Sequence, residues 1–585
     1  MSTVESLLIA NRGEIAVRVI RAARELGLRT IAVYSELDRD SLHVELADEA
    51  WNIGPPPAAE SYLDIDRIMN AAQSAGAAAV HPGYGFLAEN AEFANAVTNA
   101  GLIWVGPPSE AIRIMGDKTS SRLTAAKAGV PGVPGTFEPA EGLSEIENFA
   151  KEHGYPLAIK AAHGGGGRGL KVVTSAGDLA ASYESARREA EAWFGRSEVY
   201  IERYLEKSRH IEAQVIFDLH GNGVFLGERD CSIQRRHQKL IEEAPAPGLS
   251  PKQRKEIGKR AIAVAASADY VSAGTVEFLV DSSGEPYFLE MNTRIQVEHT
   301  ITEMVTGIDL VKTQLRIAMG EPLPFKSVET HGHAIEFRIN VEDPTADFAP
   351  TPGTLVEYQE PGGFGVRVDS GVTVGSTISQ YYDNLIAKLV VWGTNREEAM
   401  ARGIRALSDF HVAGVPTTIP AHLSILSTEA FRQGTHDTRF VEDQMCFGDA
   451  DPTSHPTLPE QEEIQERSMT VEVGGKRFVV RFWAPVTESP EMSGSGPVPR
   501  RRPPKLERST TSGHDTGVIT APMQGTIVKT YVPAGTHLKI GDPICVLEAM
   551  KMENEIKSPI EGELIDLRIQ PGDTVATGSV LAIIR

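Results

Sequence analysis

The N-terminal part of the chain alternates short apolar runs with amphipathic stretches. Residues 7–10 and 30–34 are apolar runs of strand length. Between them, apolar residues recur at the spacing of one helix face and stop before Gly27, at Ile15, Val19, Ala22, Ala23 and Leu26. This order of strand, helix and strand predicts a doubly wound parallel sheet. Further strands are expected at residues 78–80 and 103–105. The turn at residues 11–14 lacks the glycine spacing of a dinucleotide site.

A glycine-rich stretch joins two predicted strands in the next part of the chain. Residues 157–160 form an apolar run ending in Lys160, and residues 163–169 read His-Gly-Gly-Gly-Gly-Arg-Gly before another apolar run at 170–174. Backbone N–H groups approach phosphate oxygens closely where no side chain intervenes. A flexible linker is the alternative. Lys160 and Arg168 favour phosphate binding.

Two further strands are predicted to pair around a turn at residues 281–285. Residues 276–280 and 287–291 carry Glu277 and Glu290, and Asn292 follows directly. Carboxylate and amide oxygens, together with substrate phosphates, are ligands that Mg²⁺ prefers. Polar pairing on an exposed sheet face is the alternative.

Charged residues at two other places allow two interpretations each. Residues 228–240 hold five basic side chains, which form either a solvated basic face or a site for anionic substrates: Arg229, Arg235, Arg236, His237 and Lys239. Arg338 stands between apolar residues in a predicted strand, and alternation by itself places it toward solvent.

The C-terminal 65 residues contain an internal repeat. Pro522, Gly525, Gly535 and Gly541 each recur 37 positions later, and so does the pair Val546-Leu547. Glycines at fixed offsets indicate turns between short strands. Two such copies predict a β-sandwich with an exposed hairpin tip at their joint, where Lys551 lies.

Residues 548–553 read Glu-Ala-Met-Lys-Met-Glu at this joint. Local propensity favours a helix here, but the repeat favours a turn between strands. A lysine presented on such a tip suits covalent attachment of a long prosthetic arm. An ordinary surface lysine is the alternative.

Composition narrows the class of protein. A chain of 585 residues is too long for a single hydrophobic core, so several domains are expected. The net charge of −22 argues against a nucleic-acid partner. No apolar run is long enough for a transmembrane helix, and residues 1–6 lack the pattern of a signal peptide. Three widely spaced cysteines fit a reducing cytosol, so we expect a cytoplasmic protein without a metal cluster.

The region between the two large segments has the composition of a linker. Residues 451–466 and 488–516 are rich in proline and polar residues. Between them, alternating apolar residues around Gly474-Gly475-Lys476 predict a β-hairpin over 469–483. Two strands alone are marginally stable. We therefore expect this hairpin to dock on another protein surface.

Several motifs carry a resemblance to a known family. Residues 548–553 resemble the attachment site of a biotin carboxyl carrier domain, with a lipoyl domain as the second choice. Residues 1–448 resemble biotin carboxylase, an ATP-grasp enzyme, in five motifs: Ala-Asn-Arg-Gly-Glu-Ile-Ala at 10–16, His-Pro-Gly-Tyr-Gly-Phe-Leu at 81–87, Met-Gly-Asp-Lys at 115–118, Arg-Arg-His-Gln-Lys at 235–239, and Glu-Met-Asn-Thr-Arg-Ile-Gln-Val-Glu-His at 290–299. Together the two parts resemble the α subunit of an acyl-CoA carboxylase of the short actinobacterial type.

The resemblance implies a role for each matching residue. ATP would be contacted by Lys118, Lys160, Gly166, Gly167, Glu202, Leu205, His210 and His237. Mg²⁺ or Mn²⁺ would be held by Glu277, Glu290 and Asn292, and bicarbonate by Lys239, Arg294, Gln296 and Val297. Glu298 would deprotonate bicarbonate, and Arg338 would stabilise the biotin enolate. Tyr84 and Gly85 would border the biotin pocket, and biotin would be attached to Lys551.

The resemblance also implies a domain order and an overall reaction. The expected domains are an α/β domain at 1–115, an ATP-grasp domain at 116–330 with a lid at about 132–204, a C-terminal carboxylase domain at 331–448, a linker at 449–516, and an all-β biotinyl domain at 517–585. The chain would use ATP and bicarbonate to carboxylate its biotin. The carboxyl group would then pass to a short-chain acyl-CoA, acetyl- or propionyl-CoA.

The expected partners follow from the same resemblance. No segment of the sequence resembles a crotonase-like fold, so a separate carboxyltransferase β subunit is expected, docked through the 469–483 hairpin. A biotin protein ligase and a second carboxylase domain, forming a homodimer within a larger assembly, are further expected partners. The alternatives are the carboxylase subunit of a two-subunit pyruvate carboxylase and a non-catalytic biotin carrier.

Overall fold

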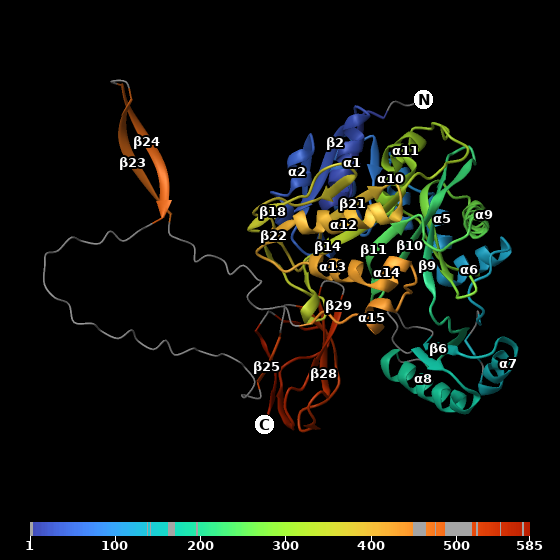
Figure 1. Cartoon of the computed structure of the whole chain (residues 1–585). Coiled ribbons are helices and arrows are strands. Elements are labelled where there is room, and N and C mark those ends of the chain that lie inside the picture. Colours follow the sequence, from blue (N-terminus) through green and yellow to red (C-terminus); the bar gives the residue numbers. More distant parts are fainter. Residues whose placement is uncertain are drawn as a thin grey trace. The chain divides into compact units, whose positions relative to one another are not determined.

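The computed structural model of the protein divides into two compact units, Met1–Asp449 and Ala450–Arg585 (Figure 1). The structure describes residues 4–136, 139–140, 142–161, 170–194, 197–448, 464–473, 476–485, 518–521, 525–549, 552–575 and 578–585. Within these ranges, the helices are all too short or too polar to cross a membrane.

A five-stranded parallel sheet begins the first unit, in the order β3-β2-β1-β4-β5. Its strands are β1 (Ser6–Ile9), β2 (Arg29–Ser35), β3 (Glu49–Gly54), β4 (Ala79–His81) and β5 (Ile103–Trp104). The helices of this segment are α1 (Gly13–Glu25), α2 (Leu42–Leu46), α3 (Ile65–Ser74), α4 (Ala91–Asn99), α5 (Ser109–Gly116) and α6 (Lys118–Lys127), of which α6 contacts β13 (Pro286–Asn292) and α9 (Pro251–Ser267). Leu7 packs with Ile15 of α1, whereas the next residue, Leu8, packs with Ile68 of α3 on the opposite face. Helices therefore cover both faces, and the predicted doubly wound sheet is confirmed.

A small antiparallel sheet follows, in the order β7-β6-β8. It comprises β6 (Leu157–Ala161), β7 (Leu170–Val173) and β8 (Val199–Arg203), with the helices α7 (Leu143–His153) and α8 (Leu179–Phe194). The helices α7 and α8 lie beside this sheet (Figure 1), and Ile146 of α7 and Tyr183 of α8 join Ile159 and Ile201 of the sheet in one apolar core. The glycine-rich stretch between β6 and β7 lies outside the described residues.

The centre of the first unit is an eight-stranded antiparallel sheet in the order β13-β12-β9-β10-β11-β14-β21-β19. The strands are β9 (Arg209–Phe217), β10 (Gly223–Arg235), β11 (Gln238–Ala244), β12 (Ser272–Val280), β13 (Pro286–Asn292), β14 (His333–Asn340), β19 (Val366–Ser370) and β21 (Leu385–Gly393). The helices that pack on it include α9 (Pro251–Ser267), α10 (His299–Thr306), α11 (Leu310–Ala318) and α12 (Arg396–Asp409). The predicted pairing of the strands that carry Glu277 and Glu290 is confirmed. β11 and β14 pair across the predicted domain boundary at residue 330, so one sheet joins both segments.

The first unit ends in short elements that complete its C-terminal core. Three two-stranded ladders pair β15 (Glu342–Asp343) with β16 (Ala349–Pro350), β17 (Gly353–Thr354) with β20 (Thr377–Ile378), and β18 (Glu357–Gln359) with β22 (His411–Ala413). The last helices are α13 (Ile419–Ser427), α14 (Glu429–Gln433) and α15 (Phe440–Gln444). Phe337 of β14, Leu407 of α12 and Ile425 of α13 are buried together here.

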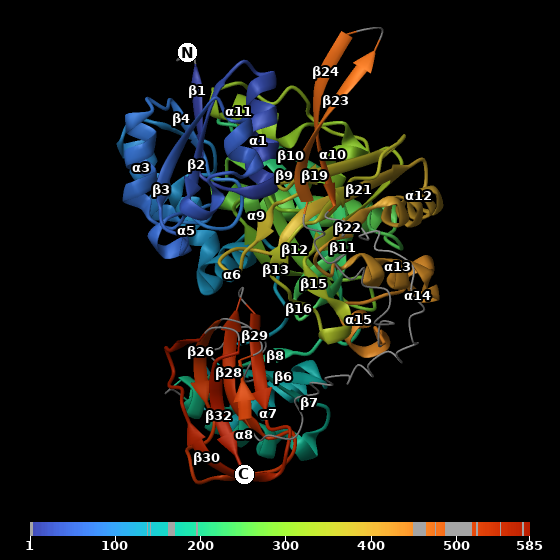
Figure 2. The ribbon, with the colours of Figure 1, turned by 90° about the vertical axis from the view of Figure 1, so that its left-hand side faces the viewer.

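The second unit contains a hairpin and a repeat domain. The hairpin pairs β23 (Ile464–Val473) with β24 (Lys476–Pro485), so it is longer than the predicted 469–483. The repeat domain has two four-stranded sheets, β25-β32-β30-β27 and β29-β28-β26-β31 (Figure 2). Its strands are β25 (Val518–Thr520), β26 (Gly525–Thr530), β27 (His537–Leu538), β28 (Pro543–Ala549), β29 (Met552–Lys557), β30 (Gly562–Leu567), β31 (Thr574–Val575) and β32 (Val580–Ile584).

The predicted repeat is visible strand by strand in this domain. β26 and β30 start at Gly525 and Gly562, the positions that the 37-residue offset relates. The turn glycines repeat as well, because Gly535 and Gly572 both have the left-handed φ angles, +91° and +98°, that glycine tolerates. The two sheets therefore have the same architecture, and the predicted sandwich is confirmed.

Candidate active site

Lys239 lies at the centre of a cluster of buried charges. It follows the two-residue turn between β10 and β11, and its ammonium contacts three carboxylates from different elements. Its Nζ atom lies 2.7 Å from Glu298 Oε1 and 3.4 Å from Glu277 Oε1, and it also donates to Glu212. Glu212 comes from β9 and Glu277 from β12, while Glu298 directly precedes α10. The sheet therefore brings together charges that are far apart in the sequence.

Glu298 is held between two cations. Its Oε1 atom accepts from Lys239, and its Oε2 atom accepts from Arg338 NH2 at 3.0 Å. Burial disfavours the charged form, but Lys239, Arg338 and Arg229 together hold the pKa of Glu298 well below its usual value. Glu298 is therefore an ionised carboxylate at neutral pH, directly beside two groups able to bind an anion.

Arg338 lies within β14 and faces this cluster. Its Nε atom donates to Glu242 Oε1 at 2.6 Å, and its side chain is only 17% exposed. The orientation toward solvent that alternation favours is thus wrong. The face of β14 that carries Arg338 is polar because it meets Glu298, not because it meets water.

Glu277 is fixed by three neutral or cationic donors in addition to Lys239. His210 Nε2, Asn292 Nδ2 and Gln296 Nε2 each lie 2.7 Å from one of its oxygens. Burial alone would raise the pKa of Glu277, but Lys239 and His210 lower it strongly. Glu277 is therefore negatively charged and fixed in orientation.

Glu290 lies opposite Glu277 in the β12–β13 ladder and is exposed. Desolvation and the charge of Glu277 raise the pKa of Glu290, a repulsion that a bound cation would relieve. Asn292 ends the same strand and accepts a hydrogen bond from Arg294 NH2 at 3.0 Å. Two carboxylates and an amide oxygen on one edge of the sheet are a donor set that fits Mg²⁺ or Mn²⁺.

The remaining residues predicted to hold bicarbonate lie between β13 and α10. Arg294 donates to Glu89 Oε2 at 3.1 Å, so part of its guanidinium is already occupied. Gln296 accepts from Arg229 NH2 at 2.6 Å. The Val297 carbonyl accepts from Lys388 Nζ at 3.0 Å. This segment is thus held in place by buried cations on its inner side.

The residues predicted to contact ATP are only partly brought together. Lys160 of β6 is ion-paired with Glu202 of β8, which also pairs with Arg122 NH2 at 2.9 Å. Leu205 follows β8 and is half-buried, while Lys118 is exposed at the start of α6. Gly166 and Gly167 lie outside the described residues. The structure brings Lys160 and Glu202 together in an ion pair. The contacts of these residues with a nucleotide remain predictions.

His210 and His237, both predicted to contact ATP, lie in different environments. His210 is buried, and its ring contacts Glu277 as described above. His237 is exposed and stands in the turn between β10 and β11, where both Arg236 and His237 have left-handed φ angles, +48° and +65°. Such a turn suits a two-residue hairpin but is unfavourable for residues other than glycine, asparagine or aspartate. Strain of this kind is found at functional sites.

Tyr84 connects the N-terminal sheet to the cluster. It stands in the loop after β4, its hydroxyl donates to Glu14, and Gly85 beside it has φ +68°. Lys388 of β21 is fully buried and lies 3.1 Å from Glu14 Oε2. Tyr84, Glu14 and Lys388 therefore form a chain of contacts that reaches the carbonyl of Val297.

The basic stretch at 228–240 does not form one surface. Arg229 is buried, donates from NH1 to Gln214 Oε1 at 2.6 Å and donates from NH2 to Glu212 Oε2 at 3.0 Å. Arg235 and Arg236 both pair with Asp347 instead. Neither interpretation of this stretch holds as a whole, because strand alternation and the tight turn send its side chains to different places.

Four buried charges of the site were missed by sequence reasoning: Glu14, Glu212, Glu242 and Lys388. One signal for Glu212 is visible in β9, where the polar residues His210, Glu212 and Gln214 alternate with apolar ones. Such alternation ordinarily indicates a solvent-facing side.

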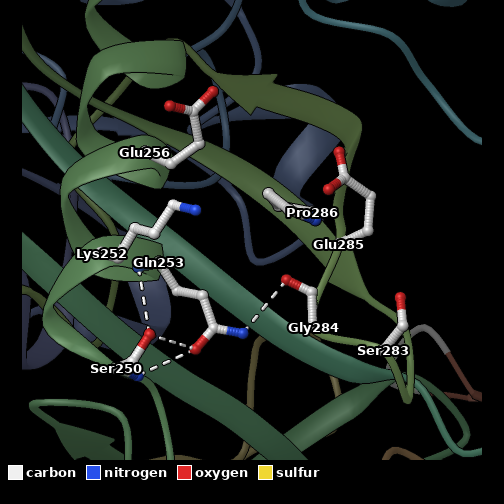
Figure 3. Close-up of a pocket in the computed structure, with 8 residues that line it drawn as sticks. All are labelled: Ser250, Lys252, Gln253, Glu256, Ser283, Gly284, Glu285 and Pro286. Carbon is white, nitrogen blue, oxygen red and sulfur yellow. Dashed lines mark hydrogen bonds between the residues drawn. The ribbon is translucent and has the colours of Figure 1, made fainter.

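A surface hollow of about 400 Å³ lies elsewhere on the first unit (Figure 3). It is lined by the start of α9 and the turn between β12 and β13, where Gln253 Nε2 donates to the Gly284 carbonyl at 3.3 Å (Figure 3). None of the predicted site residues lines this hollow.

Lys551 lies outside the described residues. The strands on either side of it, β28 and β29, pair as an antiparallel hairpin up to Ala549 and Met552. The helix that local propensity favours at 548–553 is thus replaced by strands at its described positions.

Four family models match the chain. They are "Biotin carboxylase, N-terminal domain" at residues 3–112, "Carbamoyl-phosphate synthase L chain, ATP binding domain" at 117–326, "Biotin carboxylase C-terminal domain" at 336–443 and "Biotin-requiring enzyme" at 517–584.

Curated relatives and solved structures agree with these matches. The biotin-dependent acyl-coenzyme A carboxylase alpha3 subunit of Mycobacterium leprae (strain TN) is 48% identical over 100% of this chain and 99% of its own length. A pyruvate carboxylase subunit of Methanothermobacter thermautotrophicus is 50% identical over 80% of this chain and 96% of its own length. Among solved structures, the biotin carboxylase domain of a thermophilic 2-oxoglutarate carboxylase bound to bicarbonate is 46% identical, with a TM-score of 0.73 over 75% of this chain and 98% of that one. The corresponding domain dimer from Hydrogenobacter thermophilus, in complex with MgADP, ADP and bicarbonate, is 47% identical, with a TM-score of 0.69 over 76% of this chain and 98% of that one.

Proposed function

The chain belongs to the biotin-dependent carboxylases, as a biotin carboxylase joined to a biotin carrier domain, and we propose that it supplies carboxyl groups to a separate carboxyltransferase acting on a short-chain acyl-CoA. ATP-dependent carboxylation of biotin is the reaction of this family. The observation that carries the proposal is the ionised Glu298, held between Lys239 and Arg338.

Glu298 is proposed as the general base for bicarbonate. Bicarbonate becomes a good nucleophile only when it loses its remaining proton, and a carboxylate within hydrogen-bond reach can take that proton. Lys239 and Arg294 would bind the anion, assisted by the side chain of Gln296 and the backbone of Val297. These cations favour the more negative form of the substrate and thereby compensate for the weak basicity of Glu298.

The β12–β13 edge of the eight-stranded sheet is proposed to hold the nucleotide and its metal ion. Glu277, Glu290 and Asn292 would ligate Mg²⁺ or Mn²⁺, which when bound neutralises charge on the transferred phosphoryl group. The other proposed nucleotide contacts are Lys118, Lys160, Gly166, Gly167, Glu202, Leu205, His210 and His237. Lys160 would exchange its ion pair with Glu202 for a phosphate oxygen.

Arg338 and Tyr84 are proposed to receive biotin. The biotin on Lys551 supplies a ureido nitrogen that takes up a carboxyl group. Arg338 would hold the ureido oxygen where negative charge develops, since a buried guanidinium is a fixed, preorganised donor. Tyr84 and Gly85 would border the ring.

The coverage of the relatives favours an acyl-CoA over pyruvate as acceptor. The mycobacterial acyl-CoA carboxylase subunit matches all of this chain, whereas the pyruvate carboxylase subunit matches 80% of it. Within the acyl-CoA class, acetyl- or propionyl-CoA is the proposed acceptor, with pyruvate as the second candidate. A non-catalytic carrier would have no need for the complete charge cluster around Glu298.

The hairpin β23–β24 is proposed to dock the carboxyltransferase subunit. Its register pairs Met469 with Val480 and Val471 with Phe478 at alternate positions of the ladder, while the intervening positions carry Thr470 opposite Val479 and Glu472 opposite Arg477. One face of the ladder is therefore rich in apolar positions, which an isolated two-stranded hairpin leaves without a core. Biotin protein ligase and a second copy of the carboxylase unit are the other proposed partners.

The acceptor is identified by assay of the native complex. The chain is captured on avidin from its source and supplied with ATP, radiolabelled bicarbonate, and either acetyl-, propionyl-, butyryl- or methylcrotonyl-CoA or pyruvate. Label in an acyl-CoA supports the proposal, and label in pyruvate alone selects the second candidate.

A chain that lacks residues 464–485 is expected to lose the co-purified transferase, while its own ATP hydrolysis with free biotin continues. Retention of the transferase would contradict the docking role.

A further inference from the structure

Two buried carboxylates lie beside Arg338, and one of them shares this arginine with Glu298. Glu242 of β11 and Glu336 of β14 are direct partners in the antiparallel ladder, and both are 0% exposed. Side chains at such positions lie close together on one face of the sheet. Two ionised carboxylates buried side by side repel each other strongly, so the pair needs either a cation or a proton between its members.

The hydrogen bonds of the pair indicate a proton. Glu242 Oε1 accepts from Arg338, and one oxygen of Glu336 accepts from the Thr300 hydroxyl. Within the described chain, the other two oxygens, Glu242 Oε2 and Glu336 Oε1, are buried without any hydrogen-bond partner. A buried acceptor without a partner is costly. One proton held by the pair turns one of these acceptors into a donor and removes part of this cost.

The electrostatics of the pair differ from those of Glu298. Burial and the neighbouring Glu242 raise the pKa of Glu336 well above its usual value. Burial raises the pKa of Glu242 to about 7, with Glu298 adding to the effect and Arg338 and Lys239 opposing it. Glu298, by contrast, is held well below its usual pKa by its two cations. A proton on Glu298 therefore moves downhill in free energy when it reaches the pair.

We propose that Glu242 and Glu336 share one proton at rest and take up the bicarbonate proton that Glu298 removes. This inference rests on the role proposed above for Glu298. The O–H bond of bicarbonate breaks, its electron pair stays on the attacking oxygen, and the proton passes to Glu298 and then to Glu242. The pair later releases it to solvent.

Arg338 is the group that separates the two carboxylates. Its Nε atom donates to Glu242 at 2.6 Å and its NH2 atom donates to Glu298 at 3.0 Å. When Arg338 turns toward its substrate oxygen, Glu298 and Glu242 lose their shared donor and the proton can cross, directly or through a water. Glu242 and Glu336 are thus positioning and proton-holding residues that act through Glu298.

The charged and titratable groups that face the pair come from every neighbouring element. Arg338 lies on β14, Lys239 is on β11, Lys388 is on β21, and Glu298 precedes α10. Burial opposes the charge of Arg338 and Lys239, but the surrounding carboxylates raise the pKa of both, so these two cations stay charged near neutral pH. The expected pH dependence therefore reports the carboxylates.

The first test is the pH profile of bicarbonate-dependent ATP hydrolysis with free biotin, measured on the full chain. Glu242 must be ionised to accept a proton, so the rate of the unmodified chain should fall as pH drops through about 7. Glu336→Gln keeps a neutral hydrogen-bond donor beside Glu242, as the protonated partner is, so the acid limb should stay in place, whereas Glu242→Gln should remove this limb. Glu242→Gln should lower kcat by about 10- to 100-fold. Glu342→Gln, at a buried carboxyl of β15 that pairs with Asn384, is the matched control and should leave the profile in place.

The second test is the infrared absorption of the buried carboxylic acid. The unmodified chain should show a protonated carboxyl band that persists at neutral pH, and Glu336→Gln should lose it. If the glutamine variants fail to fold, the titration of this band in the unmodified chain decides alone. Absence of the band, or an acid limb that is identical in all variants, would overturn the proton-holding role. Absence of bicarbonate-dependent hydrolysis in the folded, unmodified chain would instead overturn the role of the whole site.

Discussion

The two units of the chain differ in the kinds of side chain that they bury. At the centre of the first unit, Lys239, Glu298 and Arg338 lie among carboxylates that are almost wholly removed from water. In the repeat domain of the second unit, the residues with described burial include one buried polar side chain, Ser558, and no buried charge. The difference indicates that the first unit holds charges in fixed positions, whereas the described part of the repeat domain is built on an apolar core.

The core of the repeat domain is organised in twin positions. Two apolar clusters share five pairs of buried residues related by the 37-residue offset, with one member of each pair in either cluster: Ile527 with Leu564, Leu538 with Val575, Ile544 with Leu581, Cys545 with Ala582, and Leu547 with Ile584. Ile527 and Leu564 are both fully buried, and so are Ile544 and Leu581. The buried charges of the first unit show no such repeat, because each of them has its own set of partners.

The largest effect is expected from removing the proposed base. Glu298→Gln keeps the size of the side chain but cannot accept the bicarbonate proton, so bicarbonate-dependent ATP hydrolysis should fall about a thousandfold. Steady-state kinetics with free biotin measure this loss. Glu357→Gln, at an exposed position of β18, is the control. A loss of less than tenfold would show that another group takes the proton.

Removal of a buried cation should cost the first unit much of its stability. Lys388→Met deletes the ammonium that contacts Glu14 and the Val297 carbonyl, and an uncompensated buried carboxylate costs about 3–5 kcal/mol. Calorimetry should show an earlier transition for the first unit and an unchanged one for the repeat domain. Lys539→Met, at an exposed lysine of the repeat domain, should change neither. Equal stability of Lys388→Met and the unmodified chain would contradict the view that the charge pairing holds this unit together.

Twin truncations in the repeat domain should cost equal amounts. Ile527→Ala and Leu564→Ala each open a cavity at a fully buried position, and each should lower the free energy of unfolding by about 2–4 kcal/mol. Denaturant unfolding of the two variants measures the losses. A difference above about 2 kcal/mol would show that the pseudo-symmetry does not extend to packing.

The smallest expected effect is a pH-dependent one at the edge of the first unit. Asp38 accepts two hydrogen bonds from Arg12, at 2.6 and 2.7 Å, and although burial opposes ionisation, Arg12 lowers the pKa of Asp38 to about 2. A lowered pKa stabilises the fold above the pKa of the unfolded state, so Asp38→Asn should cost about 2 kcal/mol at neutral pH. This cost, followed by denaturant unfolding at several pH values, should shrink as pH falls from about 4 toward 2, while the repeat domain changes little. A cost that is independent of pH would show that shape, and not charge, matters at Asp38.

The sequence predicts the repeat domain better than the charge cluster. Glycine and apolar positions at a fixed offset specify both sheets, and the offset overrides the helix propensity of residues 548–553. In the first unit, apolar periodicity predicts the parallel sheet and the β12–β13 pair. It cannot predict which polar residues are buried, because Glu212 and Gln296 are brought together with Arg229 only by the folded sheet. For the same reason, alternation places Arg338 on the wrong side.

The roles of individual residues were inferred from motifs. The geometry supports the roles in the charge cluster around Glu298 but does not bear on those of the nucleotide contacts. Lys239, Glu277, Glu298 and Arg338 lie together as the resemblance implies. The exposed Lys118 and His237 stand at the start of α6 and in the β10–β11 turn, and within the part of the chain that the structure describes neither has a side-chain partner that would fix its role. Their contacts with a nucleotide therefore stay predictions.

The most direct test follows the carboxyl group from the first unit to the second. The purified, biotinylated full chain is incubated with ATP, Mg²⁺ and radiolabelled bicarbonate, beside a Lys551→Ala variant. The unmodified chain should acquire acid-labile label that depends on ATP, and the variant should acquire none but should still carboxylate free biotin. Label on the variant chain, or no ATP-dependent label on the folded, biotinylated chain, would contradict the assignment of the two units as enzyme and carrier.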